Sequence, residues 1–189
     1  MPLPKWKERF TYDDYCTWPD DERWEIIDGV AYDMSPAPIP VHQRIVLNLA
    51  GMIREILKGK TCVPFISPID VVLSEYDVVQ PDIVVVCDPN KVTEKNIQGA
   101  PDLVVEVLSP STTKKDRREK RNLYEKHGVK EYLLIDPDGL YVERYLLQEN
   151  GRYAIGEIID AQEKLAFQSL PGVEVELKEV FEIEAPAEE

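Results

Sequence analysis

The chain has 189 residues, of which 43% are hydrophobic and 31% are charged. These proportions are typical of a globular protein, and the length fits one domain with a substantial core. The formal net charge of −14 at pH 7 repels nucleic acid at long range, so binding to nucleic acid would need a local basic patch. No run is long enough to span a membrane, and the first residues lack a signal-peptide core.

Three cysteines, Cys16, Cys62 and Cys87, are scattered along the chain without CxxC spacing. An odd number at such spacings favours free thiols over a disulfide framework or a zinc site. Free thiols are typical of a reducing compartment. We therefore expect a cytoplasmic protein with no membrane partner.

The first half of the chain contains clear turn and helix signals. Thr11 is a typical helix N-cap, Asp28-Gly29 is a two-residue hairpin turn, and Ile45, Leu49 and Ile53 fall on one face of a helix. The predicted elements are a loose lead-in (1–10), a short helix (11–17), a β-hairpin (23–34), a long helix (41–57), and strands at 62–66, 70–73 and 78–86.

The second half is predicted to alternate strands with one helix that ends at Gly128. Apolar alternation after residue 140 predicts antiparallel edge strands. The predicted elements are a polar excursion (91–100), a strand (101–108), a helix (113–127), strands at 132–135, 141–147, 152–159 and 165–168, a short segment (177–181) and a disordered tail (184–189). Residues 11–183 are thus expected to form a single domain.

Two runs introduced by Pro-Asp dominate the middle of the sequence. Residues 79–86 and 101–108 are almost continuous Val, Ile and Leu, as in strands buried on both faces. Asp82 and Glu106 interrupt these runs, and a buried carboxylate is costly unless a cation or metal pairs with it. If the two strands are neighbours, both carboxylates form a hard-oxygen site suited to Mg²⁺ or Mn²⁺. Asp102 is a poorer partner for Glu106, because four residues of strand span about 13 Å.

The helix at 113–127 places one lysine on its inward face. Leu123, Tyr124 and His127 define that face, and Lys120 lies at its centre with Asp116 one turn earlier. A lysine facing buried carboxylates can neutralise them or hold a reacting anion.

The same helix carries a local basic patch. Eight of the 22 Lys and Arg residues lie between positions 114 and 130, and such a patch can hold a phosphate-bearing substrate. Lys114 and Lys115, together with Arg118 and Arg121, are expected to point outward.

The ordered set of motifs resembles the Uma family of restriction-endonuclease-like proteins, within the PD-(D/E)XK nuclease superfamily. The blocks that carry the resemblance are Trp24-Glu25-Ile26-Ile27-Asp28-Gly29, Gln80-Pro81-Asp82, the segment from Pro101 to Thr112, and Gly128-Val129-Lys130-Glu131-Tyr132. The resemblance covers about residues 10 to 183. It implies an α/β fold in which a restriction-endonuclease-like mixed β-sheet is flanked by helices, with an N-terminal β-hairpin and antiparallel C-terminal strands.

The resemblance also implies a Mg²⁺- or Mn²⁺-dependent endonuclease that hydrolyses phosphodiester bonds, with DNA the expected substrate. Asp82 and Glu106 are implied metal ligands, assisted by the carbonyl of Val107, and Glu25 matches an acidic residue of the family. The superfamily lysine two residues after the glutamate is replaced by Leu108, and Lys120 is its natural substitute. The implied catalytic residues are Lys120, Glu106, Asp82 and Glu25. The candidate substrate-binding residues are His42, Lys114, Lys115 and Arg117. A homodimer is expected, because one such site cuts one strand.

Other interpretations stay open. Asp82 can be a strand-end residue that binds a loop, Lys120 can pair with Asp116 or reach solvent, and Glu25 can face solvent in the hairpin. His42 can be a packed helix-start residue, and the basic patch can be a solvated helix face. The alternative functions are a catalytically inactive nuclease-fold binding or scaffolding module, favoured by the charge of −14 and by Leu108, and a small metallo-phosphohydrolase.

Overall fold

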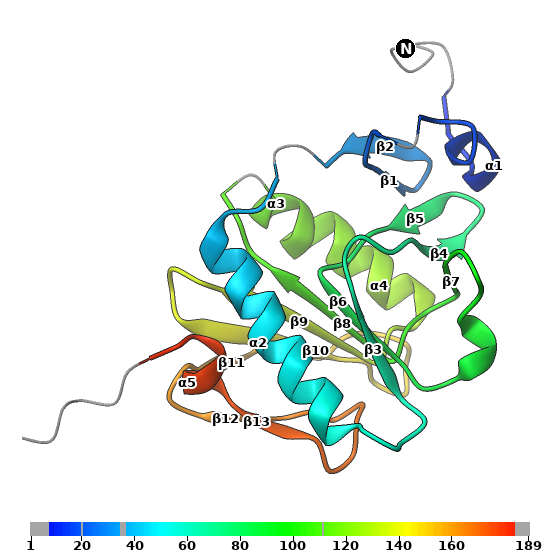
Figure 1. Cartoon of the computed structure of the whole chain (residues 1–189). Coiled ribbons are helices and arrows are strands. Elements are labelled where there is room, and N and C mark those ends of the chain that lie inside the picture. Colours follow the sequence, from blue (N-terminus) through cyan, green and yellow to red (C-terminus); the bar gives the residue numbers. More distant parts are fainter. Residues whose placement is uncertain (1–7, 20, 35–36, 111, 184–189) are drawn as a thin grey trace, which may run out of the picture.

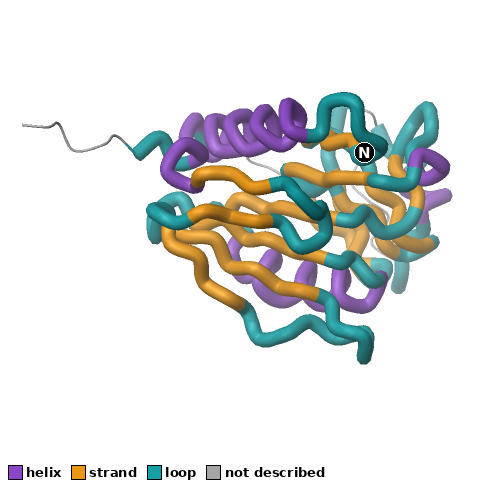
Figure 2. The backbone as a smooth tube through the Cα atoms, turned by 90° about the horizontal axis from the view of Figure 1, so that it is seen from below, coloured by secondary structure: helices purple, strands orange, loops and turns teal. Residues whose placement is uncertain are grey.

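The computed structural model describes residues 8–19, 21–34, 37–110 and 112–183 of the chain. The predicted tail (184–189) and residues 1–7 of the predicted lead-in lie outside this part. In the part described, helices lie on both sides of a mixed sheet, and a second sheet adjoins one end of it (Figures 1 and 2). The predicted α/β class, a mixed sheet flanked by helices, is confirmed. No described helix is both long enough and apolar enough to cross a membrane.

The central sheet holds the two Pro-Asp runs side by side. Its strands in spatial order are β11 (Glu157–Asp160), β10 (Tyr141–Leu146), β9 (Glu131–Asp136), β8 (Leu103–Val107), β6 (Ile83–Val86) and β3 (Val63–Ile66). β8 and β9 are parallel, and the other neighbouring pairs are antiparallel. Every residue of β6 and β8 is buried, which confirms the prediction of strands covered on both faces.

Helix α2 (Pro40–Ile56) covers one face of the central sheet. Its residues Ile45, Leu49 and Ile53 are buried one turn apart and belong to the same core cluster as Leu103 and Val105 of β8. The C-terminal elements complete this core; they are β12 (Lys164–Ala166), β13 (Glu174–Glu176) and α5 (Leu177–Val180). Because side chains alternate along β8, Val104 and Glu106 face the opposite side.

A continuous helical segment covers that opposite side. It consists of α3 (Thr113–Lys115), the π-helical turn η2 (Asp116–Lys120) and α4 (Arg121–His127). Leu123 and Tyr124 belong to the same buried cluster as Val104, and Gly128 ends the segment with a left-handed φ of 80°. The predicted helix is therefore confirmed, but the π turn in its middle was not predicted.

The second sheet is built on the N-terminal hairpin. Its strands in spatial order are β2 (Val30–Asp33), β1 (Trp24–Ile27), β5 (Asp77–Val79), β4 (Val71–Ser74) and β7 (Ile97–Gln98). The hairpin turns at Asp28 and Gly29, both with positive φ, as the sequence predicted. Helix α1 (Tyr12–Tyr15) precedes it and is capped by the Thr11 side chain. Figure 1 shows the hairpin above α3 and the start of α2.

Several strand boundaries differ from the prediction. Residues 78–86 do not form one strand, because the chain leaves the second sheet after Val79 and enters the central sheet at Ile83. Pro81 has no N–H to donate, and the N–H of Gln80 donates to Glu25 Oε1 at 3.1 Å. Strands β7 and β13 were not predicted, and β11 is shorter than the predicted strand at 152–159. A 3₁₀ turn, η1 (Pro89–Lys91), opens the polar excursion.

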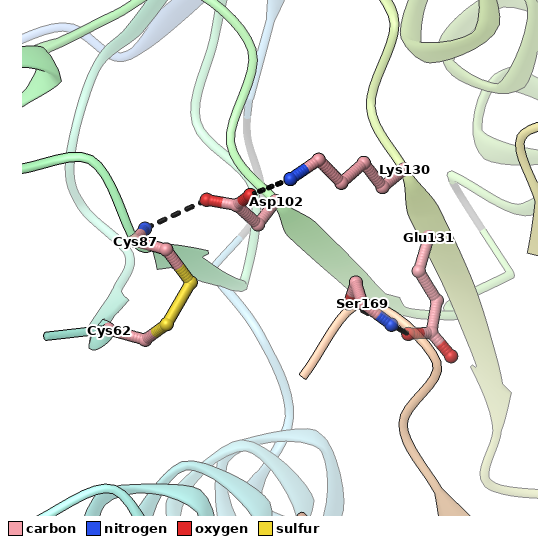
Figure 3. The surroundings of a disulfide bond; sticks show 6 residues. All are labelled: Cys62, Cys87, Asp102, Lys130, Glu131 and Ser169. Carbon is pink, nitrogen blue, oxygen red and sulfur yellow. Dashed lines mark hydrogen bonds and ion pairs between the residues drawn. A yellow bond between two sulfur atoms is a disulfide. The ribbon is translucent and has the colours of Figure 1, made fainter. Parts of the chain in front are cut away.

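The prediction of three free thiols is wrong. Cys62 and Cys87 are joined by a disulfide (Figure 3), and Cys16 is free and exposed. Cys62 precedes β3 and Cys87 follows β6, and Val63 pairs with Val86 in that antiparallel register. The two cysteines are therefore opposite each other across neighbouring strands, although 25 positions separate them in sequence.

Candidate active site

The two carboxylates that interrupt the buried runs lie on adjacent strands. Ile83 pairs with Val105 in the antiparallel register of β6 and β8, so Asp82 lies opposite Glu106. Asp82 Oδ2 accepts a hydrogen bond from the N–H of Val107 at 2.8 Å. The predicted juxtaposition of the two acids is confirmed.

Lys120 faces this pair from the π turn. Its Nζ lies 2.7 Å from Glu25 Oε1, 2.8 Å from Glu106 Oε1 and 3.8 Å from Asp116 Oδ1, and its side chain is only 3% exposed. The Tyr124 hydroxyl also donates to Glu106 Oε1, at 2.9 Å. The inward position of Lys120 is confirmed, and the alternative in which it reaches solvent is wrong.

Glu25 joins the hairpin to this cluster. Its side chain is fully buried, and Oε2 accepts from Lys115 Nζ at 2.6 Å while Oε1 contacts Lys120. The solvent-facing alternative for Glu25 is therefore wrong, and so is the outward position expected for Lys115. The π turn accounts for the second error. In an α-helix, residues five apart differ by about 140° in direction, whereas a π turn closes i to i+5 and brings Lys115 and Lys120 to one side.

Burial and charge together shift the pKa values in this cluster. Burial, reinforced by Asp116, Asp82 and Glu25, raises the pKa of Glu106 to about 8, against the opposing effect of Lys120. Burial also raises the pKa of Asp116. Burial acts in the same direction on Glu25, but the two lysine charges outweigh it and hold the pKa of Glu25 below its ordinary value. Burial would lower the pKa of Lys120, yet its carboxylate neighbours hold it well above the usual range.

The four candidate substrate-binding residues do not all come together. His42, on the first turn of α2, places Nε2 3.1 Å from Asp82 Oδ2, and its buried Nδ1 has no hydrogen-bond partner among the described residues. Lys114 and Lys115 line the same cavity as Asp82. Arg117 does not line it, because its guanidinium is paired with Glu143 of β10 and donates to the Tyr141 hydroxyl at 2.9 Å.

Asp102 lies outside the site, as its spacing from Glu106 predicted. It precedes the opposite end of β8, where Oδ2 accepts from the N–H of Cys87 at 2.8 Å and Oδ1 accepts from Lys130 Nζ at 2.6 Å (Figure 3). Nearby, Glu131 Oε2 accepts from the backbone and hydroxyl of Ser169. The two Pro-Asp aspartates thus have different surroundings despite their similar sequence context.

The clustered side chains open into a cavity of about 750 Å³. Residues of the hairpin, of the first turn of α2 and of the α3–η2 segment line it, together with Asp82, Glu106 and Val107. Arg23 and Tyr32 are among the lining residues that were not singled out from the sequence. The register pairs Tyr32 with Glu25 in the hairpin, so an inward Glu25 would have indicated Tyr32 as well.

The donor set fits a divalent cation that keeps much of its water. Mg²⁺ is usually bound by one or two carboxylates, waters and substrate phosphates rather than by a closed protein cage. The described residues contain no cluster of three His, Cys, Asp or Glu side chains that could hold a metal by themselves. Asp82 and Glu106 supply two adjacent carboxylates beside a cavity, and the buried Oδ1 of Asp116 accepts no hydrogen bond among the described residues.

The mixed sheet, the adjacent acids and the buried lysine define a restriction-endonuclease-like protein. A family model described as "Putative restriction endonuclease" (Uma2) matches residues 12–178. The chain belongs to this family. The crystal structure of a protein described as "a putative nuclease" from Anabaena variabilis superposes with a TM-score of 0.76 at 21% identity, covering 92% of this chain and 98% of that one. The fold expected from the resemblance is therefore confirmed.

A relative of similar length has no described activity. It is a protein from Synechocystis sp. described as uncharacterized, 29% identical over 158 residues, which cover 82% of this chain and 80% of the relative. The family description points to a nuclease, and it names neither a metal nor a substrate.

Proposed function

We propose that the protein is a Mg²⁺- or Mn²⁺-dependent endonuclease that hydrolyses phosphodiester bonds in DNA. The observation that carries the proposal is the contact between Lys120 and Glu106 beside Asp82, at the edge of a cavity. The family description supports cleavage of nucleic acid. Asp82 and Glu106 would hold the metal with the help of the Val107 carbonyl, and a divalent ion bound there supplies water activation and charge neutralisation at the phosphate.

The two lysines are proposed to have different roles. Lys120 is held by Glu25 and Glu106 and is almost fully buried, so it balances the carboxylates and orients Glu106. Lys115 contacts one carboxylate, its side chain is 17% exposed, and it lines the cavity. A partly exposed ammonium at the cavity wall is placed to bind a substrate phosphate. His42 orients Asp82 through its 3.1 Å contact.

Arg117 stabilises the fold and does not bind the substrate, because its guanidinium is held by Glu143 and Tyr141. One site cuts one strand, so cleavage of both strands of a duplex takes a homodimer or two encounters.

The two Pro-Asp aspartates provide a matched test. We expect Mg²⁺ or Mn²⁺ to support cleavage of plasmid and single-stranded DNA, and EDTA to abolish it. Asp82→Asn and Glu106→Gln should lower the cleavage rate at least about 100-fold, since each removes a metal ligand. Asp102→Asn, at the other end of β8, should cleave like the wild type.

A second function, a binding module without catalysis, is favoured by one observation: the net charge of −14 opposes the approach of a long polyanion. Calorimetric titration with Mn²⁺ separates the two. If neither metal binding nor cleavage of any nucleic acid is detected with folded wild-type protein, the nuclease proposal is wrong and the binding module stands.

A further inference from the structure

We infer that the cavity accepts one unpaired nucleotide, so that the DNA bound by the proposed nuclease is single-stranded or locally unpaired. The inference rests on the proposed function for the kind of ligand. Three features of the molecule carry it: the ion pairs of the basic helix, the size of the cavity, and the aromatic ring in its wall.

The basic patch predicted from the sequence is largely neutralised in the structure. Five of its eight cations are paired with carboxylates; the pairs are Lys115–Glu25, Arg117–Glu143, Lys120–Glu106, Lys126–Asp28 and Lys130–Asp102. The other three form no ion pair within the part of the chain described: Lys114 and Arg118 are exposed, and Arg121 lies over the Tyr145 ring. A protein that holds a duplex commonly neutralises about six to ten phosphates. This face offers far fewer cations, and the net charge of −14 opposes a long polyanion.

The cavity itself is suited to a single nucleotide. Its volume of about 750 Å³ lies within the range of about 300–1,000 Å³ typical of pockets that enclose a small molecule. A base that is stacked and paired in a duplex cannot enter such a pocket, and enzymes with enclosed sites reach a nucleotide only after it has left the stack. An unpaired nucleotide requires no such step.

Tyr32 provides a stacking surface beside the reacting groups. It pairs with Glu25 in the hairpin register, so both side chains lie on the same face of the hairpin, and Tyr32 lines the cavity. Lys115 Nζ lies 5.5 Å from the centre of the Tyr32 ring. Aromatic rings stack with any base, which is how proteins bind single strands without sequence preference. The ring and the ammonium together match the base and the phosphate of one nucleotide.

Arg23 supplies a second cation at the cavity wall. Its guanidinium donates to Gln80 Oε1 at 2.8 and 3.0 Å and to the Ser67 hydroxyl at 2.8 Å. Both partners are neutral, so the positive charge of Arg23 remains available to a phosphate. Lys114 is unpaired as well among the described residues, and Lys115 shares the single charge of Glu25 with Lys120. Together with Arg23, these lysines match the few phosphates of a short single strand.

The test compares binding of a labelled 12-nucleotide single strand with binding of the same sequence as a blunt duplex. Fluorescence anisotropy is measured in EDTA and again in Ca²⁺. We expect the single strand to bind at least tenfold more tightly than the duplex. Tyr32→Ala should weaken single-strand binding by about fivefold or more, and Tyr32→Phe, which keeps the ring, should bind like the wild type.

Tyr76 provides the matched control. Like Tyr32, Tyr76 is half-buried, and it lies between β4 and β5 of the second sheet. The Arg9 guanidinium lies 4.1 Å from its ring centre, but Tyr76 does not line the cavity. Tyr76→Ala should leave binding unchanged. The logarithm of the affinity should fall with the logarithm of salt concentration with a slope of about −2, because about 0.7 of a charge is released per phosphate of a single strand.

The outcomes separate this inference from the proposed function. Duplex binding equal to or tighter than single-strand binding, absent binding, or Tyr32→Ala binding like the wild type would each overturn the inference. Duplex cleavage that depends on Asp82 and Glu106 would leave the nuclease proposal standing in that case. Conversely, Tyr32-dependent single-strand binding, with neither binding of Mn²⁺ nor cleavage of any nucleic acid, would sustain the inference and reject the nuclease.

Discussion

At the scale of single residues, Lys120 and Lys115 differ in what their removal leaves behind. Lys120→Met would leave Glu25 and Glu106 facing each other without the cation between them, and breaking such a buried pair costs about 3–5 kcal/mol. Lys115→Met would leave Glu25 in contact with Lys120 and with the N–H of Gln80. We therefore expect urea unfolding to show a large loss of stability for Lys120→Met and about 1 kcal/mol or less for Lys115→Met.

Cleavage assays on the same variants assign the roles. Lys115→Met should stay folded at 25 °C and yet lose cleavage, because the phosphate contact is gone. Arg118→Met, an exposed change on the same helix, should alter unfolding by no more than about 0.5 kcal/mol and leave cleavage unchanged. Wild-type cleavage by Lys115→Met would contradict the phosphate role.

Glu106 makes the stability of the metal-free protein depend on pH. Its pKa rises from 4.5 to about 8 on folding, so its contribution is complete below pH 4.5 and is lost as the pH rises through 8. Glu106→Gln keeps the neutral form at every pH. We expect urea unfolding in EDTA, measured between pH 5 and 8.5, to show this difference. The free energy of unfolding of Glu106→Gln should rise relative to that of the wild type by up to about 1.4 kcal/mol per pH unit.

The lowered pKa of Glu25 affects the free energy of unfolding only at acid pH. Its contribution is present above its ordinary pKa and is lost as the pH falls below it, so it leaves the window from pH 5 to 8.5 undisturbed. Parallel stability curves for the wild type and Glu106→Gln would show that Glu106 is ionised throughout, contrary to its surroundings in the structure.

At the scale of elements, the sequence predicted those site residues whose charge is unusual for a buried strand or an apolar helix face. Asp82 and Glu106 stood out because acids within buried strands need partners, and Lys120 stood out because it falls on an apolar helix face. These signals are local, and the structure confirms all three positions. The direction of Lys115 depends on a π turn, which changes the phase of the helix without any marker in residue type. The break in the predicted strand at 78–86 depends on the contact between Gln80 and Glu25, 55 residues apart.

The π turn η2 is therefore an element with a testable consequence. Deleting Arg118 removes the extra residue of the turn and leaves Lys115 and Lys120 four positions apart, about 40° apart around a regular α-helix. Both lysines should therefore still reach Glu25, and we expect helix content by circular dichroism and cleavage to persist. Arg118→Ala keeps the residue count and should retain cleavage as well. Loss of cleavage in the deletion variant, in protein still folded, would show that the π geometry itself is needed to position the lysines.

At the scale of the whole molecule, charge and connectivity are decided by pairs that are distant in sequence. Counting lysines and arginines predicted a basic patch on the helix, but the carboxylates that neutralise it come from β1, β8 and β10 and from loops beside them. Composition therefore described the net charge correctly and the local charge poorly. The disulfide was missed for the same reason, because the spacing of the cysteines in the sequence does not indicate that Cys62 and Cys87 meet across the paired strands β3 and β6.

The disulfide allows stability to be separated from activity. It closes a loop of 25 residues, and a constraint of that length on the unfolded chain is worth about 3 kcal/mol. It lies at the end of β6 opposite to Asp82, so reduction should leave the site intact. We expect a reducing agent to lower the free energy of urea unfolding by about that amount while cleavage at 25 °C is unchanged. Cys62→Ser should reproduce the loss and abolish its dependence on reductant, whereas Cys16→Ser should behave like the wild type. Loss of cleavage on reduction, in protein still folded, would instead mean that the position of β6, and with it Asp82, depends on the covalent link.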